Sequence, residues 1–416
     1  MLQIAVEGTS RMKRNRLAVL ALALTAAVHM AGAARAEADG IWGSPQDTCA
    51  ADGSSKDLVA PPAPAFAAAH SGDPGISRKL AKRQTINVAG PWLDRERHDV
   101  NDYGVVWHSW DAAPGGDAIW LREILWVHYK PERLKTSFRH HVVGLDKFMT
   151  EEPWQTSEEY GTSLRLRYED PVYAAYMAAT VSQMLANTGA DGVFLDWWID
   201  NQPYLSEPEV RIARTRIAKA IRSKVGPGPI IMGNVGWTRE ASTHASLNGV
   251  FMELWKRPSK RGYSCLELLR IEDLLAFHDR NLAQPKIVVL EPWRQSKSSS
   301  SSDRKTKRNM AWAKLFTAMA AVVPRNGYIL YSDNARDRNS DDHGHFYYDI
   351  YRTDLGRPTS GYGAIARGVG YRRFEKGIVA YNATPADVTV QLDGRPLRLK
   401  PLTGAFCTRG EKDWDC

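Results

Sequence analysis

Residues 192–196 read Gly-Val-Phe-Leu-Asp, a short apolar run that ends in a carboxylate. The same pattern recurs as Gly-Val-Phe-Met-Glu at residues 249–253 and as Ile-Val-Val-Leu-Glu at residues 287–291. Near-continuous apolar runs of β-branched and large residues are typical of buried parallel strands. Each run is followed by tryptophan, at Trp197, Trp198, Trp255 and Trp293. These runs therefore predict buried strands that carry an acid at their carboxyl ends.

Strand-like runs of this kind occur eight times between residues 84 and 340. The expected strands are Thr85–Ala89, Gly104–His108, Ile124–Tyr129, Val193–Asp196, Ile230–Asn234, Val250–Glu253, Ile287–Glu291 and Tyr328–Ser332. For the third, a helix over Ile119–Tyr129 is an equal alternative. Strands that alternate with helices form βαβ units, and eight of them favour a closed (β/α)8 TIM barrel over an open sheet. No Gly-x-Gly-x-x-Gly follows the first strand, which argues against a dinucleotide-binding fold.

The helices of the later crossovers are predicted from their end signals. Asp170-Pro171 is a cap followed by a first-turn proline, and Gly189 stops the same helix. Ser206 and Glu209 form a capping box that opens the next helix. Apolar residues at helical spacing predict two further helices, over residues 266–282 and 309–323.

The pattern changes after residue 340, where short β-rich segments replace the alternation of strands and helices. Asp393-Gly394 between two of these segments is a hairpin signal. We expect a targeting segment at 1–36, a Pro- and Ala-rich segment of little regular structure at 37–83, the barrel at 84–340, and a small antiparallel β-sandwich at 341–416.

The N-terminus has the features of a cleavable export signal. Four basic residues precede an apolar run at 17–27, and Ala34-Arg35-Ala36 fits a small-x-small cleavage site. We expect a periplasmic or extracellular protein, with membrane contact only if this segment is retained. The formal charge of +8 falls to +4 without residues 1–36, at 50 basic against 46 acidic residues. Such a small excess does not indicate a nucleic-acid partner.

Four cysteines in an exported chain predict disulfides. Cys407 and Cys416 are close enough in sequence to close a small loop, which would leave Cys49 and Cys265 to pair, although the sequence does not fix the connectivity. The absence of Cys-x-x-Cys disfavours a zinc site. The stretch at residues 341–345, Asp-Asp-His-Gly-His, contains metal-ligand types, but we interpret it as a polar loop. We expect no metal and no cofactor.

Asp196, Glu253 and Glu291 directly end strong strand signals, on strands four, six and seven of the expected eight. Carboxyl ends of barrel strands meet at one face, where barrel enzymes keep their chemistry. Glycosidic cleavage requires one carboxyl group that protonates the leaving oxygen and a second that attacks the sugar or activates water. Three such acids beside tryptophans predict a saccharide-cleaving site, because sugar C–H faces stack on indole rings.

The remaining candidates are polar or aromatic residues at other strand ends, expected to contact substrate. They are Glu291, Trp197, Trp198, Asn234, Trp237, Trp255, Trp293, His108 and Asp333.

The run at residues 189–196, Gly-Ala-Asp-Gly-Val-Phe-Leu-Asp, resembles the fourth-strand motif of bacterial glycoside hydrolases with a TIM barrel. This group includes the endo-α-1,4-polygalactosaminidase-related and hypothetical glycosyl hydrolase families. The segments 234–237, 248–253 and 285–292 fall where such proteins place strands five to seven, and residues 374–406 resemble the small β-sandwich that often follows.

The resemblance implies catalytic acids after strands four and six, as in the α-galactosidase-like clan. Asp196 would then be the nucleophile or base and Glu253 the general acid. In the other large barrel clan the acids follow strands four and seven, with Asn before the first. This chain has Leu195 at that position, which disfavours Glu291 as the partner without excluding it.

The expected function is therefore hydrolysis of a polysaccharide or oligosaccharide in an exported enzyme. Two alternatives stay open: a non-catalytic carbohydrate-binding barrel, and an envelope scaffold that presents loops such as the basic segment 298–308. The sequence identifies neither the sugar nor the linkage, and it does not distinguish retention from inversion.

Overall fold

The structure is a computed structural model of the chain. It describes residues 56–66, 71–82, 85–92, 99–109, 112–129, 145–157, 161–255, 262–295, 304–335 and 343–416. The chain divides into two compact units, and every described residue belongs to the second, Ala51–Cys416. The predicted targeting segment, Cys49 and the low-complexity run 298–302 lie outside the described residues. No described helix is both long and apolar enough to span a membrane.

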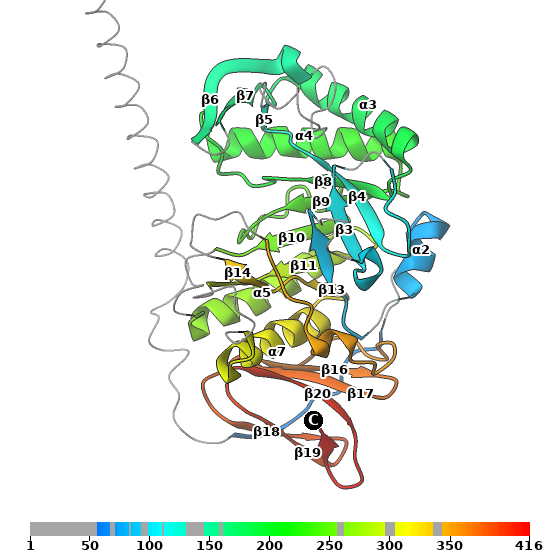
Figure 1. Ribbon diagram of the computed structural model, residues 1–416, viewed down its shortest axis with the longest axis vertical. Coiled ribbons are helices and arrows are strands. Elements are labelled where there is room, and N and C mark those ends of the chain that lie inside the picture. Colours follow the sequence, from blue (N-terminus) through cyan, green and yellow to red (C-terminus); the bar gives the residue numbers. More distant parts are fainter. Residues whose placement is uncertain are drawn as a thin grey trace, which may run out of the picture. The chain divides into compact units, whose positions relative to one another are not determined.

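Eight parallel strands form the barrel, which confirms the predicted fold (Figure 1). In spatial order the strands are β2 (Ala89–Pro91), β3 (Val105–His108), β4 (Ile119–Ile124), β8 (Gly192–Leu195), β9 (Ile230–Asn234), β10 (Gly249–Glu253), β11 (Ile287–Glu291) and β13 (Asn326–Ile329). A parallel bridge between Val88 and Ile329 joins the first strand to the last and closes the barrel.

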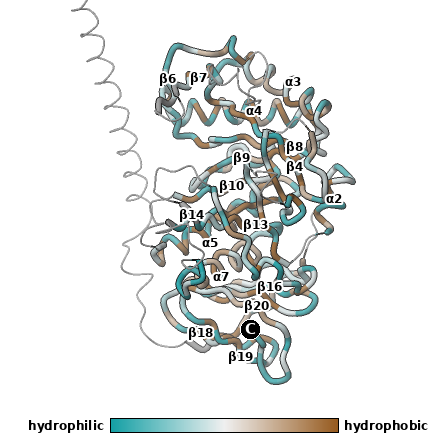
Figure 2. The backbone as a smooth tube through the Cα atoms, in the orientation of Figure 1, coloured by the Kyte–Doolittle hydropathy of each residue, from teal (hydrophilic) through white to brown (hydrophobic). Residues whose placement is uncertain are grey.

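Alternate residues of these strands face two different hydrophobic layers. Residues such as Leu121, Phe194, Met232, Phe251 and Val289 pack together inside the barrel. Their neighbours along each strand belong to the larger cluster between strands and helices. Figure 2 shows the hydrophobic colouring along the barrel strands. Because side chains alternate with a period of two, the next inward positions after the apolar layer lie at the carboxyl ends of the strands.

The predicted crossover helices are present and end close to their signals. They are α3 (Pro171–Thr188), α4 (Glu207–Val225), α5 (Cys265–Asn281) and α7 (Lys307–Val322). Asp170 caps α3 through the Val172 N–H, and Gly189 ends that helix in the left-handed conformation. The capping box between Ser206 and Glu209 is formed at the start of α4.

Three barrel strands lie elsewhere than predicted. The third runs from 119 to 124 rather than from 124 to 129, while the first begins at 89 and the eighth ends at 329. Residues 128–129 instead form β5 (His128–Tyr129), which pairs antiparallel with β7 (Gly161–Leu166) beside β6 (Met149–Ser157). The apolar stretch 119–129 thus contains both the barrel strand β4 and the first strand of an inserted sheet, β5. The composition of the stretch does not show where one strand ends and the next begins.

The C-terminal part contains two sheets that share a hydrophobic cluster, as a β-sandwich does. One has the order β15 (Gly363–Ala366), β16 (Val369–Phe374), β17 (Gly377–Asn382), β20 (Thr403–Arg409) and β21 (Trp414–Asp415). The other contains β1 (Lys56–Val59), β18 (Val388–Leu392) and β19 (Arg395–Leu399). Asp393 and Gly394 both have positive φ in the hairpin turn, as the sequence predicted.

Strand β1 corrects the expectation of little regular structure before residue 83. Lys56–Val59 pairs in parallel with Val388–Gln391 of the C-terminal sheet. Helix α2 (Pro74–Ala81) follows, with Asp73 as its cap. The predicted boundaries of the domains remain predictions.

The disulfide between Cys407 and Cys416 is formed. Cys265 is disulfide-bonded as well, and its predicted pairing with Cys49 stays a prediction.

The remaining described elements are short. They are β12 (Trp293–Gln295), β14 (Ser332–Ala335), and the 3-10 helices η1 (Val100–Asp102), η3 (Leu145–Phe148) and η5 (Asp349–Arg352). Strands β12 and β14 pair in parallel just beyond the carboxyl ends of the seventh and eighth barrel strands. Helix α7 packs between the barrel and strands β17 and β20 (Figure 1).

Candidate active site

Five polar residues occupy the inward positions directly above the apolar layer of the barrel. They are Glu123 on β4, Asp196 after β8, Asn234 on β9, Glu253 on β10 and Glu291 on β11. Each lies two residues beyond an inward apolar residue, for example Asp196 beyond Phe194 and Glu253 beyond Phe251. The structure therefore brings the three predicted acids to one end of the barrel, together with Asn234 and with one acid that was not predicted.

Asn234 joins Asp196 to Glu253 through a single nitrogen. Its Nδ2 donates to Oδ1 of Asp196 and to Oε2 of Glu253, at 2.9 Å each. The amide oxygen of Asn234 accepts the Gly236 N–H at 3.2 Å, which fixes the orientation of the amide. Two acceptors on the two hydrogens of one amide nitrogen lie about 5 Å apart. Asn234 thus sets the spacing between the two carboxylates.

The turn after Asp196 supplies a second N–H donor to this carboxylate. Trp197 has a φ of 54°, in the left-handed region that bulky residues avoid. In this conformation its backbone N–H donates to Oδ1 of Asp196 at 2.9 Å. Strain of this kind persists where the surrounding structure holds it, and it is concentrated at functional sites.

The surroundings of Asp196 raise its pKa to about 7. Burial is the main cause, and the negative charges of Glu123 and Glu253 add to it. The N–H groups of Asn234 and Trp197 oppose the shift, because they donate to the ionised form. Asp196 therefore changes its charge within the physiological pH range.

Glu123 is not among the predicted site residues, because the third strand lies at Ile119–Ile124 and not at the predicted Ile124–Tyr129. With the strand at 119–124, Glu123 continues the inward parity of Ile119 and Leu121. Its Oε2 accepts the indole N–H of Trp92 at 2.8 Å. The signal that could have found it is the apolar run Ile-Trp-Leu at residues 119–121, which is followed by Arg122 and Glu123.

Glu291 is fully buried beside Glu253, its register partner on the neighbouring strand. Its Oε1 accepts from the Ser332 hydroxyl and lies 2.8 Å from Nδ1 of His343. Burial raises the pKa of Glu291, while His343 lowers it in part.

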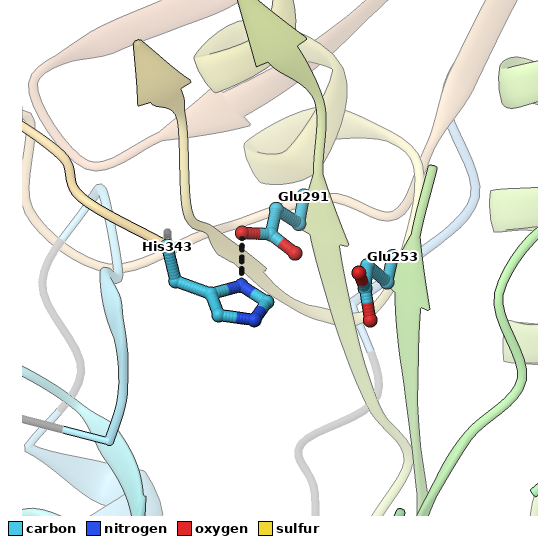
Figure 3. Close-up of side chains that lie close together, drawn as sticks. All are labelled: Glu253, Glu291 and His343. Carbon is cyan, nitrogen blue, oxygen red and sulfur yellow. Dashed lines mark hydrogen bonds and ion pairs between the residues drawn. The ribbon is translucent and has the colours of Figure 1, made fainter. Parts of the chain in front are cut away.

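His343 belongs to the stretch 341–345, which was interpreted above as a polar loop. Its side chain nevertheless lies beside Glu253 and Glu291 (Figure 3). Its ring lies 4.4 Å from that of Trp92 and 5.1 Å from that of Trp293, centre to centre. Its position depends on a loop that returns after the last barrel strand, which residue spacing does not predict.

The predicted tryptophans divide into exposed and buried rings. Trp197 and Trp255 are 41% and 40% exposed. Trp255 stacks on the buried Trp237, with ring centres 5.9 Å apart. Trp198 and Trp293 are 0% and 1% exposed, so their rings fill the interior and offer no face to a ligand. The available stacking surfaces are thus those of Trp197 and Trp255.

Two other predicted contacts lie apart from the five polar residues. His108 has the opposite parity to the inward Trp107, so it points to the outer side of its strand. Asp333 is fully buried and accepts hydrogen bonds from Arg304 and Tyr348. These bonds join β14 to the residue Arg304, which precedes α7, and to Tyr348, which precedes η5.

Within the described residues, one group has the donor types and the proximity for a metal ion. It comprises Glu253, Glu291 and His343, whose ligand atoms all lie within 4.8 Å of one another.

The family model of hypothetical glycosyl hydrolase family 15 matches residues 146–378. This range covers more than half of the chain and contains Asp196, Asn234, Glu253, Glu291 and His343. No curated protein matches the chain.

Solved structures similar to this chain are remote in sequence. An α-amylase from Geobacillus thermoleovorans complexed with acarbose has 14% identity and a TM-score of 0.44, and the match covers 73% of this chain and 88% of that one. A GH27 β-L-arabinopyranosidase from Geobacillus stearothermophilus has 12% identity and a TM-score of 0.43, over 80% and 98%. Ega3 from Aspergillus fumigatus, in complex with galactosamine, has 12% identity and a TM-score of 0.39, over 62% and 94%.

Proposed function

Since this chain belongs to hypothetical glycosyl hydrolase family 15, we propose that it hydrolyses glycosidic bonds of a polysaccharide, with Asp196 and Glu253 as the catalytic carboxylates. The observation that carries the proposal is the amide of Asn234, which donates to both carboxylates at 2.9 Å. This reaction requires two carboxyl groups beside the scissile bond, and here one amide donor positions both at the carboxyl end of the barrel.

The spacing supports a retaining mechanism. Carboxyl groups about 5–5.5 Å apart leave no room for a water between acid and sugar, so one of them attacks the anomeric carbon itself. The two acceptors of Asn234 have a spacing of about this size. Water then hydrolyses the glycosyl-enzyme with help from the second acid.

Asp196 is the nucleophile in this proposal and Glu253 the acid and base. A nucleophile must be ionised. Two N–H groups, from the Trp197 backbone and from Asn234, donate hydrogen bonds to Oδ1 of Asp196, and such bonds favour the ionised carboxylate. Glu253 protonates the leaving oxygen and later deprotonates the water. Because the pKa of Asp196 is raised to about 7, the rate falls as the pH drops below that value and the nucleophile becomes neutral.

The exposed rings of Trp197 and Trp255 give the sugar chain its stacking surfaces. Trp197 directly follows Asp196, and Trp255 lies two residues beyond Glu253. Both rings therefore lie next to a catalytic acid in the chain, where successive sugar units would pass. Stacked C–H faces position a sugar without demanding a particular hydroxyl pattern.

Export to the periplasm or the cell exterior completes the proposal. The N-terminal basic and apolar segment supports it, as does the disulfide between Cys407 and Cys416, because disulfides persist in oxidising compartments.

The test is release of reducing ends from a panel of neutral, acidic and amino polysaccharides. The wild type is expected to cleave one class, whereas Asp196→Asn and Glu253→Gln lose at least about 10³-fold in kcat and keep their melting temperature. Asp273→Asn, on the outer helix α5, is the matched control and keeps full activity. Full activity of both catalytic-site variants on a cleaved substrate would refute the assignment.

Two further readouts complete this test. The anomer first released, followed by NMR, distinguishes retention from inversion. Calorimetric binding of a glycan without any cleavage would support the alternative of a non-catalytic binding barrel.

A further inference from the structure

We propose that Glu253, Glu291 and His343 form a binding site for a divalent transition-metal ion, with Zn²⁺ the best fit, and that the bound ion inhibits hydrolysis (Figure 3). The binding part stands on the geometry of the three side chains. The inhibitory part rests on the function proposed above.

The three side chains are already spaced almost as ligands of one ion. One carboxylate oxygen of each glutamate and one ring nitrogen of His343 lie within 4.8 Å of one another. Ligand atoms ~2.0–2.2 Å from a zinc ion are at most about 4.4 Å apart. Nδ1 of His343 and Oε1 of Glu291 are hydrogen-bonded at 2.8 Å, so these two atoms would move apart to the roughly 3.4 Å that separates adjacent ligands of a tetrahedral zinc ion. Rotation of the three side chains would then complete the site.

A second observation supports a cation site. Among the described residues, none donates a hydrogen bond to Oε2 of Glu291, although Glu291 is fully buried. A buried carboxylate oxygen without a donor is unfavourable, and a bound cation compensates its charge. Figure 3 shows one carboxylate oxygen of Glu291 hydrogen-bonded to the His343 ring and the other directed toward Glu253.

The backbone keeps the two glutamates together despite their like charge. They are register partners on β10 and β11, so neither can move away without disturbing the barrel. A proton shared between them would require a short O–H···O contact, and Oε2 of Glu291 makes none within the part of the chain that the structure describes. A metal ion fits a wider gap than a proton does, which favours the ion.

The donor set selects the class of ion. Ca²⁺ takes six to eight oxygen ligands, and Mg²⁺ prefers oxygen and retains its waters. One imidazole nitrogen with two carboxylates suits Zn²⁺ or Mn²⁺, and Zn²⁺ binds a given site more tightly than Mn²⁺. Three protein ligands leave a fourth position of the tetrahedron for water.

Binding of the ion would interfere directly with acid catalysis. Zinc would coordinate the carboxylate oxygen of Glu253 that otherwise binds the catalytic proton. A zinc-bound Glu253 therefore cannot protonate a leaving group. Zinc therefore inhibits, and chelation restores the rate.

The experiment is calorimetric titration of chelator-treated full-length protein with Zn²⁺, without substrate. We expect one ion per chain, and at least about tenfold weaker binding in Glu291→Gln and in His343→Gln. His345→Gln is the matched control, because His345 lies on the same segment but contacts Tyr103, and it keeps the affinity. A cooperative melting transition without zinc verifies that each variant folds. A zinc-dependent rise in melting temperature is expected in the wild type and the control and not in the two ligand variants.

The two parts of the proposal fail separately. Absence of stoichiometric binding, or affinity unchanged in both ligand variants, overturns the site. Stoichiometric binding without loss of glycosidase activity overturns only the inhibitory part. Because the titration needs no substrate, it decides the site even if no polysaccharide is cleaved.

Discussion

Two buried histidines predict how the fold responds to acid. His244 and His278 are 1% and 0% exposed, and Nε2 of the first lies 2.8 Å from Nδ1 of the second. Burial lowers the pKa of His244 to about 4, with help from the charge of Arg214. Burial lowers the pKa of His278 to about 3, and the proximity of His244 adds to the effect. Both rings are neutral in the folded protein at neutral pH.

The sign of the effect follows from these depressed values. An unfolded chain protonates each histidine near pH 6.5, whereas the folded protein does so only near pH 4 or below. The stabilisation is present above pH 6.5 and is lost as the pH falls toward the folded values. Between pH 7 and pH 5 each ring accounts for about 2 kcal/mol, so the pair accounts for about 4 kcal/mol.

The measurement compares urea-unfolding free energies at pH 7 and pH 5 in the wild type and in His244→Gln/His278→Gln. Glutamine can retain a hydrogen bond but does not titrate, so the variant should lose about 4 kcal/mol less than the wild type over this interval. His108→Gln, at a partly exposed histidine, controls for the general effect of a His→Gln substitution. Equal losses in the double variant and the wild type would refute the reasoning.

Three predictions concern the site itself. Asn234→Ala should lower kcat about 100-fold without unfolding the protein, because the two acids lose their common donor, and steady-state kinetics with a melting curve checks this. Glu123→Gln removes a negative charge beside Asp196 and so lowers the pKa of Asp196. The acidic limb of the pH–rate profile should therefore move to lower pH. An unmoved limb would contradict the electrostatic effect of Glu123 on Asp196. Trp255→Ala should raise KM about tenfold with kcat little changed, and kcat falling in step with kcat/KM would instead indicate a role in the transition state.

The part of the site that was predictable from the sequence is the part carried by local patterns. Asp196, Glu253 and Glu291 end apolar runs whose composition alone predicts buried strands, and the strand count placed them on strands four, six and seven. The parity of residues then places Asn234 in the same layer.

The part that was missed depends on contacts between distant segments. Glu123 was overlooked because the apolar stretch 119–129 contains two elements with no turn residue to separate them. His343 reaches Glu291 through a loop 52 residues further along the chain, and no local pattern encodes such a return. Trp198 and Trp255 follow strands in the same way, yet one is fully buried and one is 40% exposed. Burial of this kind is decided by the packing of several elements.

The pairing of β1 with β18 makes completion of the C-terminal sheet depend on two segments that are far apart in the sequence. Lys56–Val59 has its partner at Val388–Gln391, on the other side of the whole barrel sequence. Contacts between such distant segments form slowly, because a long loop has to close first. A C-terminal domain expressed from residue 341 onward would lack its edge strand and would expose part of its hydrophobic cluster. A C-terminal domain expressed by itself would therefore have to carry the β1 segment, Lys56–Val59, fused to the residues from 341 onward.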